Sequence, residues 1–239
     1  MGRVAVAKRR QEQSVLGLGV YTLPEAARLV QTTTTRVRRW LLGYRFPLRT
    51  GATAQSAPIF KPQLPQTEGH WAIGFLDLVE LLFIKGFRDM RIALPYIRLA
   101  ARRAAKRWKT DHPFCLKRFS TDGYEIFETL VDEVGEEELR EVTKGQYHFY
   151  SVLGPYLRQL DYSDAGDVLR WWPLGKKRDI VVDPAVAFGR PVVVGSSVPT
   201  EAIFAAVGAN ESERQVATWY DLPISSVRAA VEFEESRAA

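Results

Sequence analysis

The chain has 239 residues, of which 46% are hydrophobic and 26% are charged, as is usual for a globular protein of one or two domains. No apolar run reaches the roughly 18 residues of a membrane-spanning helix, and a single cysteine, Cys115, excludes an intramolecular disulfide framework. We therefore expect a cytoplasmic protein with no membrane partner.

The net charge of +5 is unevenly distributed along the chain. Residues 26–67 contain seven lysines and arginines and no acid, whereas residues 197–239 contain seven acids and three arginines. A basic segment of this kind favours a polyanionic partner. The two ends of the chain are therefore predicted to bind different partners.

Two short helices joined by a tight turn are predicted after residues 1–14, which form a basic arm that we expect to be disordered. Thr22 is a suitable N-cap for a first helix that ends near Val30. Thr33 is the preferred N-cap of the second helix, and Gly43 ends it. This N-cap places three apolar residues on one face: Val37, Trp40 and Leu41.

The next part of the chain is predicted to combine a hairpin with a helical pair. Residues 45–69 contain four prolines and therefore do not form a helix. The apolar pieces 58–60 and 71–73 are predicted to pair as a hairpin. Helices are predicted over residues 75–87 and 94–108.

The remainder of the chain is predicted to mix short strands with short helices, which makes the fold class mainly α with some β (α+β). Residues 117–130 predict a hairpin around Thr121-Asp122-Gly123, and the acid-rich residues 132–141 a short surface helix or loop. Short strands are predicted within residues 157–163, 168–175 and 179–184. Three short helices are predicted over residues 200–207, 211–220 and 223–235.

The second N-terminal helix has the features of a DNA-recognition helix in a helix-turn-helix. Hydroxyl and free N–H groups at its N-terminus can bind phosphate, and outward arginines can reach phosphates or guanine edges. Trp40 is expected to anchor the helix to its core. The alternative is an amphipathic helix pair whose basic face is solvated. The predicted DNA-binding residues are Thr33, Thr34, Thr35, Arg36, Arg38, Arg39, Arg45 and Arg49.

A second basic face is predicted on the helix over residues 94–108, which includes Arg98, Arg102 and Arg107. It is either a further phosphate-binding surface or the solvated face of a bundle helix. The three histidines are scattered, and the glycines of residues 189–195 lack the Gly-Lys-Ser/Thr of a phosphate-binding loop. We therefore expect no enzymatic activity, no metal site and no cofactor.

The N-terminal part resembles the MerR-like regulators. The resemblance is carried by residues 21–41, which read YTLPEAARLVQTTTTRVRRWL, and by residues 77–100, which read DLVELLFIKGFRDMRIALPYIRLA. It implies a winged helix-turn-helix followed by a helical extension. The chain departs from the family in four ways: Gln31 replaces the usual turn glycine, the wing is long and proline-rich, no long dimerising coiled coil follows, and no cysteine cluster is present for metal sensing.

The C-terminal part resembles a small trihelical domain that is widespread in bacterial antitoxin-like proteins. Residues 189–199 read GRPVVVGSSVP, and the last predicted helix contains VRAAVEF, although Ser197 stands where an arginine is usual. A MerR-like reader joined to this domain resembles a two-domain VapB-type antitoxin. The implied domains are an arm (1–14), a winged helix-turn-helix with helical extension (15–110), a β-containing connector (111–182) and the trihelical domain (183–239).

This resemblance implies an antitoxin that neutralises a PIN-domain ribonuclease toxin and represses its own operator DNA, most simply as a homodimer. An arginine of the antitoxin can pair with the carboxylates that hold Mg²⁺ in such toxins. The alternatives are a stand-alone MerR-like regulator with a small-molecule effector, and a scaffold that does not bind DNA. The trihelical domain can bind toxin, DNA or a second copy of itself. The candidate toxin-binding residues are Arg214, Arg228 and Arg237.

Overall fold

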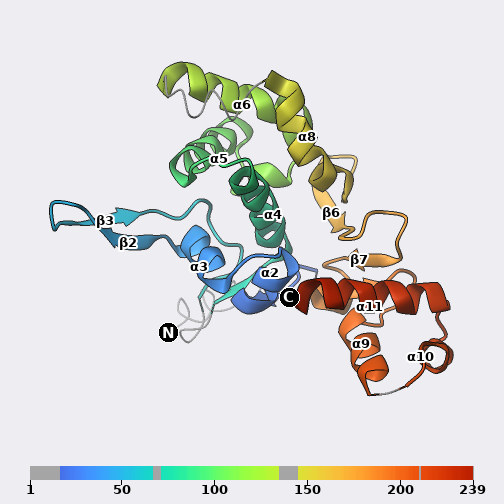
Figure 1. The fold of residues 1–239 in the computed structure, drawn as a ribbon. Helices are drawn as coiled ribbons and strands as arrows, with labels where there is room; N and C mark the ends of the chain where they lie inside the picture. The colour runs from blue at the N-terminus through green and yellow to red at the C-terminus, as the bar shows by residue number, and fades with distance from the viewer. Residues whose placement is uncertain (1–16, 67–70, 135–144, 210, 239) are drawn as a thin grey trace, which may run out of the picture.

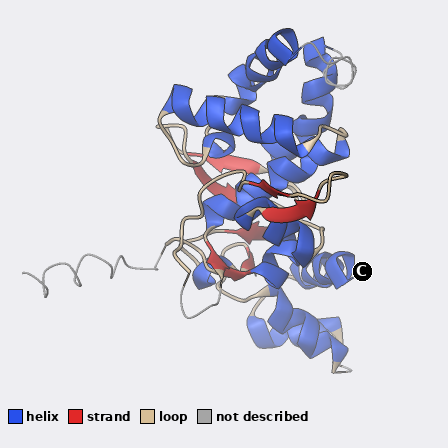
Figure 2. Cartoon of the chain, turned by 90° about the vertical axis from the view of Figure 1, so that its left-hand side faces the viewer, coloured by secondary structure: helices blue, strands red, loops and turns tan. Residues whose placement is uncertain are grey.

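The computed structural model describes residues 17–66, 71–134, 145–209 and 211–238. Figure 1 shows a mainly helical molecule with small sheets, which confirms the predicted fold class. In Figure 2 the strands occupy the middle of the molecule, with helices above and below them. The predicted basic arm, residues 1–14, lies outside the described residues.

The two N-terminal helices begin where their caps predict. Helix α2 spans Leu23–Leu29. The Thr22 hydroxyl accepts the Glu25 N–H (3.3 Å), and the Glu25 carboxylate accepts the Thr22 N–H (2.7 Å), so each end of the capping box satisfies the other. Helix α3 spans Thr34–Leu42 and begins after its N-cap, Thr33. Both helices therefore confirm the sequence prediction.

The chain continues from α3 into a hairpin, here called the wing, which projects from the body of the molecule in Figure 1. Its strands are β2, Tyr44–Pro47, and β3, Thr53–Ser56. They pair antiparallel, with Tyr44 opposite Ser56. All residues of both strands are exposed or half-buried, so the wing adds nothing to the hydrophobic core.

The hairpin predicted between residues 58–60 and 71–73 is wrong. Ile59 is instead buried in the core, where its N–H donates to the carbonyl oxygen of Trp40 (2.9 Å). Ile59 is therefore apolar because it packs in the core beside α3, and it does not belong to a strand. The strands that pair in this region are β1, Tyr21–Thr22, and β4, Ala72–Ile73.

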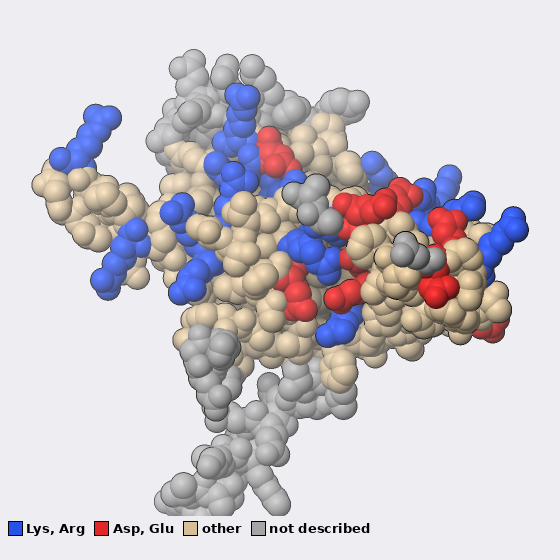
Figure 3. Space-filling view, turned by 60° about the horizontal axis from the view of Figure 1, so that its bottom comes forward, with Lys and Arg blue, Asp and Glu red and all other residues tan. Residues whose placement is uncertain are grey.

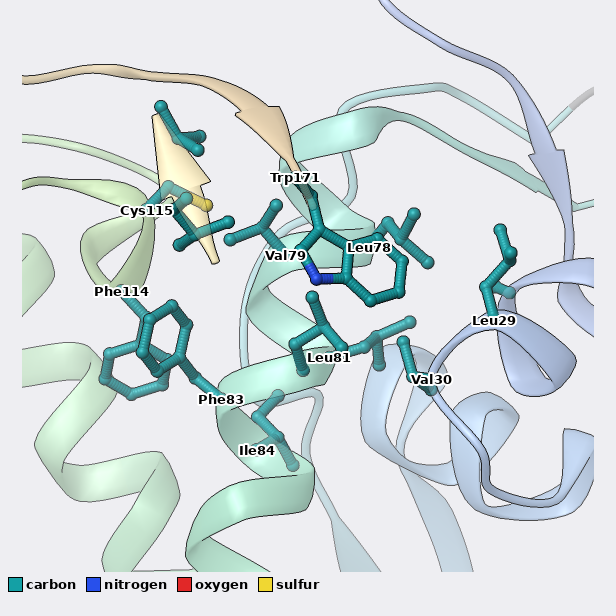
Figure 4. Close-up of a cluster of buried hydrophobic side chains, with 14 of the residues drawn as sticks. Leu29, Val30, Leu78, Val79, Leu81, Phe83, Ile84, Phe114, Cys115 and Trp171 are labelled. Carbon is teal, nitrogen blue, oxygen red and sulfur yellow. The ribbon is translucent and has the colours of Figure 1, made fainter. Parts of the chain in front are cut away.

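Helix α4, Phe75–Asp89, runs through the centre of the structure and is buried along most of its length. Figure 4 shows the Trp171 indole lying against α4, with Leu29 of α2 and its C-cap Val30 to one side and Phe114 to the other. All four of these side chains are at least 98% buried. The helix-turn-helix and the middle of the chain therefore share one core around α4.

A layer of helices covers the other side of α4. The ring of Phe87 on α4 lies 5.1 Å from the ring of Phe114 and 4.9 Å from that of Phe127, measured between ring centroids. Aromatic pairs at these separations add to the stability of the core. The elements of this layer are α5, Leu94–Trp108; the 3₁₀ turn η1, Pro113–Cys115; α6, Phe119–Val134; and α8, Gly145–Arg158.

The hairpin predicted over residues 117–130 is also wrong, because this segment lies in the helix α6. Phe119 and Phe127 are fully buried, and the helix places both against aromatic side chains of α4. Gly123 accommodates the Phe119 ring, since a Cβ atom there would lie 2.7 Å from it. The surface helix or loop predicted over residues 132–141 falls largely outside the described residues.

The C-terminal third contains a four-stranded antiparallel sheet and three helices, which confirms the predicted strands and helices there. The sheet order is β5-β6-β7-β8. Strands β7 and β8 pair antiparallel, although β7 lies before position 183 in the sequence and β8 after it. The strands are β5, Leu160–Tyr162; β6, Val168–Trp171; β7, Ile180–Val182; and β8, Pro191–Val193. The helices are α9, Thr200–Gly208; α10, Glu213–Tyr220; and α11, Ile224–Ala238.

The C-terminal helices dock directly on the helix-turn-helix. Glu234 of α11 is 4% exposed, and its carboxylate pairs with the Arg28 guanidinium of α2 and accepts the hydroxyl of Thr200. The Gln31 side chain donates to the Ser236 carbonyl oxygen (3.1 Å). These contacts attach α11 to both the second half of α2 and the turn that follows it.

A buried polar cluster fixes the start of α4. The Asp77 carboxylate is fully buried and accepts the N–H groups of Gly74 (2.9 Å) and Gln63 (3.0 Å). His112 Nε2 lies 2.9 Å from Asp77 Oδ1. These bonds satisfy the carboxylate and connect α4 to the loops before it and after α5.

Glu80 lies one turn further along α4, and its burial makes the free energy of unfolding depend on pH. Its Oε1 accepts the Phe114 N–H (2.8 Å), but the buried Oε2 has no hydrogen-bond partner within the described part of the chain. Burial raises the pKa of this carboxyl well above its usual 4.5. The folded chain therefore keeps a proton that the unfolded chain releases. Above pH 4.5 this group lowers the free energy of unfolding by up to about 1.4 kcal/mol per pH unit, until the raised pKa is passed.

We expect Glu80→Gln to abolish this pH dependence, because the amide keeps the acceptor for Phe114 and cannot ionise. Urea unfolding at about pH 5, 6 and 7 should show the variant gaining stability over the wild type as pH rises. The exposed Glu128→Gln on α6 is the control and should follow the wild type. Parallel pH profiles for wild type and Glu80→Gln would contradict the assignment.

Candidate nucleic-acid interface

The exposed face of α3 carries the predicted arginines. Val37, Trp40 and Leu41 are buried, which confirms Trp40 as an anchor to the core. Because successive helical residues are about 100° apart, Arg39 lies near the middle of the opposite face. Arg36 and Arg38 lie on either side of it, and all three arginines are exposed.

The threonines at the start of α3 have different roles. Thr33 is the N-cap, and its hydroxyl accepts the Arg36 N–H (3.3 Å). Thr34 and Thr35 lie in the first turn with their side chains exposed. Their hydroxyls therefore stand beside the free N–H groups of the helix N-terminus, which is a favourable place for a phosphate.

The turn before α3 uses a strained residue. Gln31, where the resembled family has glycine, adopts a left-handed conformation with φ of 54°. Its side-chain amide is bonded to Ser236 of α11, so the departure from glycine coincides with a contact between the turn and the C-terminal helices. The sequence showed the unusual residue but could not show this contact.

The wing carries the other two predicted DNA-binding residues. Arg45 on β2 and Arg49 at the tip are both exposed. Phe46 and Leu48 of the same hairpin are also exposed, at 37% and 44%. A projecting hairpin with cationic and apolar side chains has the shape and chemistry to lie against a nucleic-acid groove.

The joint between α3 and the wing depends on Gly43. Its backbone has φ of 72° and ψ of −177°, a region essentially restricted to glycine. A Cβ atom at this position would lie 2.2 Å from the carbonyl oxygen of Ser56. On the next residue, the Tyr44 ring lies 5.2 Å from the Arg39 guanidinium, so the wing also contacts the exposed face of α3.

Arg98 holds the wing on α5, a role that its place in a basic helix did not reveal. Its Nε donates to the Ala57 carbonyl oxygen (2.9 Å) and its Nη2 to the Ser56 hydroxyl (2.7 Å). Burial, together with the nearby charge of Arg102, lowers the pKa of the Arg98 guanidinium. Elsewhere on α5, Arg107 lies 3.5 Å from Glu125. This face therefore contains structural contacts as well as exposed cations.

The charge asymmetry seen in the sequence is present on the folded surface. Figure 3 shows Lys and Arg side chains along the wing at the left, and acidic side chains gathered toward the C-terminal helices at the right. The predicted DNA-binding side chains of α3 and the wing belong to two adjoining elements. They are therefore brought together on one basic end of the molecule.

The three candidate toxin-binding arginines are in different environments. Arg214 on α10 is exposed, and among the described residues no carboxylate pairs with it. Arg228 is exposed, and its Nε lies 2.7 Å from a carboxylate oxygen of Glu213. Arg237 is half-buried, with its guanidinium 3.9 Å from the centre of the Phe233 ring. The structure does not bring the three together.

Comparisons with known proteins support the resemblance. Residues 180–233, from β7 to α11, match the family described as "Protein of unknown function (DUF433)". The chain is 24% identical over 223 residues to "Putative antitoxin VapB45" of Mycobacterium tuberculosis, an alignment that covers 89% of this chain and 92% of that protein. The similarity to a VapB-type antitoxin therefore extends over most of the chain.

The fold is also similar to a solved structure. The crystal structure of Rv2018 from Mycobacterium tuberculosis matches with a TM-score of 0.71 and 24% sequence identity. The match covers 88% of this chain and 96% of that one, so the two proteins share an overall fold. Within the described ranges, no helix is long and apolar enough to cross a membrane.

We expect Gly43→Ala to destabilise the fold by about 2–4 kcal/mol, because it combines backbone strain with a clash against Ser56. Gly51→Ala, at the tip of the wing, is the matched control: its φ of 82° is also positive, but a Cβ atom there meets nothing within 4 Å. It should cost only about 1 kcal/mol. Urea unfolding of both variants tests this, and equal destabilisation would show that the Ser56 contact is unimportant.

Proposed function

We propose that this protein is an antitoxin that binds and neutralises a PIN-domain ribonuclease and binds its own operator to repress transcription. The observation that carries the proposal is the exposed arginine face of α3, next to a cationic wing, in a chain similar over most of its length to an antitoxin. In this proposal the protein has no catalytic role of its own and acts in the bacterial cytoplasm.

Operator binding is proposed to use α3 in the major groove and the wing on the adjacent backbone. Arg39 and Thr35 lie near the middle of the exposed α3 face and are placed to meet base edges. Arg36 and Arg38, on the two sides of that face, and Arg45 of the wing are placed to meet phosphates. Because one short helix reads few base pairs, we propose a homodimer that reads two half-sites.

Toxin binding is proposed to involve α10, where Arg214 lies exposed. A guanidinium without a carboxylate partner among the described residues is suited to pair with the acidic residues that hold Mg²⁺ in such a toxin. Trp219 on the same helix is 55% exposed and supplies the kind of large apolar side chain that is enriched in protein interfaces. Arg228 and Arg237 are further candidates, but both are already engaged within the chain.

Replacing Arg36, Arg38 and Arg39 together with alanine should weaken binding to the upstream region of the gene by about a hundredfold or more. The dependence of log K on log salt should flatten by about one unit for each phosphate that the variant no longer neutralises. Fluorescence anisotropy at several salt concentrations measures both effects.

The control for charge alone is the triple variant Lys117→Ala, Lys177→Ala and Arg190→Ala, which removes three exposed cations elsewhere. This control should retain most of the affinity, because these residues lie off α3 and the wing. If both triple variants bind DNA like the wild type at physiological salt, the recognition-helix assignment fails.

Co-expression with the product of the adjacent gene should give a stable complex with suppressed ribonuclease activity. Arg214→Glu should weaken that complex by about thirtyfold, as expected for an interface arginine, and leave DNA binding unchanged. Lys177→Glu, on the turn between β6 and β7, is the matched control. A complex unaffected by Arg214→Glu would move the toxin contact away from α10. Absence of any complex, with DNA binding intact, would refute the antitoxin proposal.

A further inference from the structure

A cavity of about 420 Å³ lies where four parts of the chain meet. Its walls come from the turn between α2 and α3, the middle of α4, the C-terminal half of α8, and the end of β6 with the residues that follow. Arg237, near the end of α11, completes the lining. The cavity therefore lies between the α2–α3 turn, the central helix α4 and the end of α11.

The charged groups that line this cavity are both cations, Lys85 and Arg237, and no carboxylate is among the lining residues in the part of the chain that the structure describes. Lys85 Nζ lies 2.7 Å from Asp89, which is outside the lining. No described carboxylate forms an ion pair with Arg237, although the charge of Glu234 lies close enough to act on it. The neighbouring Glu234 is occupied by Arg28 and Thr200.

The Arg237 guanidinium is only partly satisfied. Its Nη1 donates to the Ser236 hydroxyl (2.8 Å) and lies 3.4 Å from the Phe233 carbonyl oxygen, while the buried Nε has no hydrogen-bond partner among the described residues. Burial lowers the pKa of this group to about 10. A half-buried guanidinium without an anion is energetically costly, and an anion in the cavity would remove that cost.

The rest of the lining fits an anion with an apolar body. The Gln159 side-chain oxygen accepts the Trp171 indole N–H (3.2 Å), which leaves the Gln159 amide as a hydrogen-bond donor. Apolar walls are supplied by Leu82, Val152 and the Trp171 ring. The cavity is lined by polar and apolar groups in similar amounts, and convergent donors beside apolar walls are a usual feature of a small-molecule site.

We propose that this cavity binds a small organic anion, with its acidic group on Arg237 and its apolar or aromatic body between α4, α8 and Trp171. The acidic group is a carboxylate or a phosphate, since both pair with a guanidinium. The site adjoins Gln31 in the turn before α3. It goes beyond the proposed antitoxin function and depends neither on DNA nor on a toxin.

The test uses 8-anilinonaphthalene-1-sulfonate, a fluorescent organic anion, with the full-length protein. It should bind saturably, and Arg237→Gln should weaken its binding at least tenfold. Arg190→Gln, which removes an exposed arginine just before β8, is the matched control and should bind like the wild type. The uncharged N-phenyl-1-naphthylamine should bind wild type and Arg237→Gln equally. Circular dichroism and the Tm of each variant establish that it is folded.

A second variant, Val152→Trp, fills the cavity from α8 without altering Arg237 and should also abolish binding of the sulfonate probe. Competition separates the two acid classes: benzoate should displace the probe if the site favours carboxylates, and phenyl phosphate if it favours phosphates. Equal probe binding by wild type, Arg237→Gln and Val152→Trp would overturn the proposal. So would failure of both competitors to displace the probe.

Discussion

The carboxylate of Glu234 is the group on which the arrangement of the helix pair α2–α3 and the C-terminal helices depends. A carboxylate that is only 4% exposed is tolerated when its oxygens have partners, and here one oxygen pairs with Arg28 of α2 and the other accepts the hydroxyl of Thr200 on α9. Removal of Arg28 would leave a buried charge without its counter-ion, and removal of the Thr200 hydroxyl would leave one carboxylate oxygen without a hydrogen bond. One side chain of α11 therefore fixes the distance between the helix-turn-helix and the trihelical segment.

A second contact makes this docking specific. The Tyr21 hydroxyl, just before α2, donates to the carbonyl oxygen of Gly189 (2.7 Å). The Val20 N–H donates to the carbonyl oxygen of Phe188 (3.0 Å). A Cβ atom on Gly189 would lie 2.3 Å from the Tyr21 hydroxyl, so only glycine allows the approach. Displacement of the C-terminal helices must break these bonds as well as the Glu234 bridge. Several independent contacts therefore connect the N-terminal helix pair to the C-terminal segment.

The elements that sequence reasoning predicted correctly are those whose signals are local. The caps Thr22 and Thr33 mark the starts of α2 and α3, because a cap needs only its own first turn. The segment around Gly123 was mispredicted because Thr-Asp-Gly is a strong local turn signal. Its helix is determined by burial of Phe119 and Phe127 against α4, a helix distant in the sequence. The local residues favour a turn in this segment, whereas tertiary packing favours a helix, and the folded protein has the helix.

The same distinction explains which part of the candidate site could be predicted. The acid-free window predicted the basic region of α3 and the wing, and the helical spacing correctly placed Arg36, Arg38 and Arg39 on the exposed face. Sequence alone could not separate arginines available to a partner from those used within the fold. Arg28 and Arg98 lie in or beside the same basic region, yet one neutralises Glu234 and the other binds the wing backbone. Availability depends on the neighbours that folding supplies, so charge counts alone overestimate the surface open to DNA.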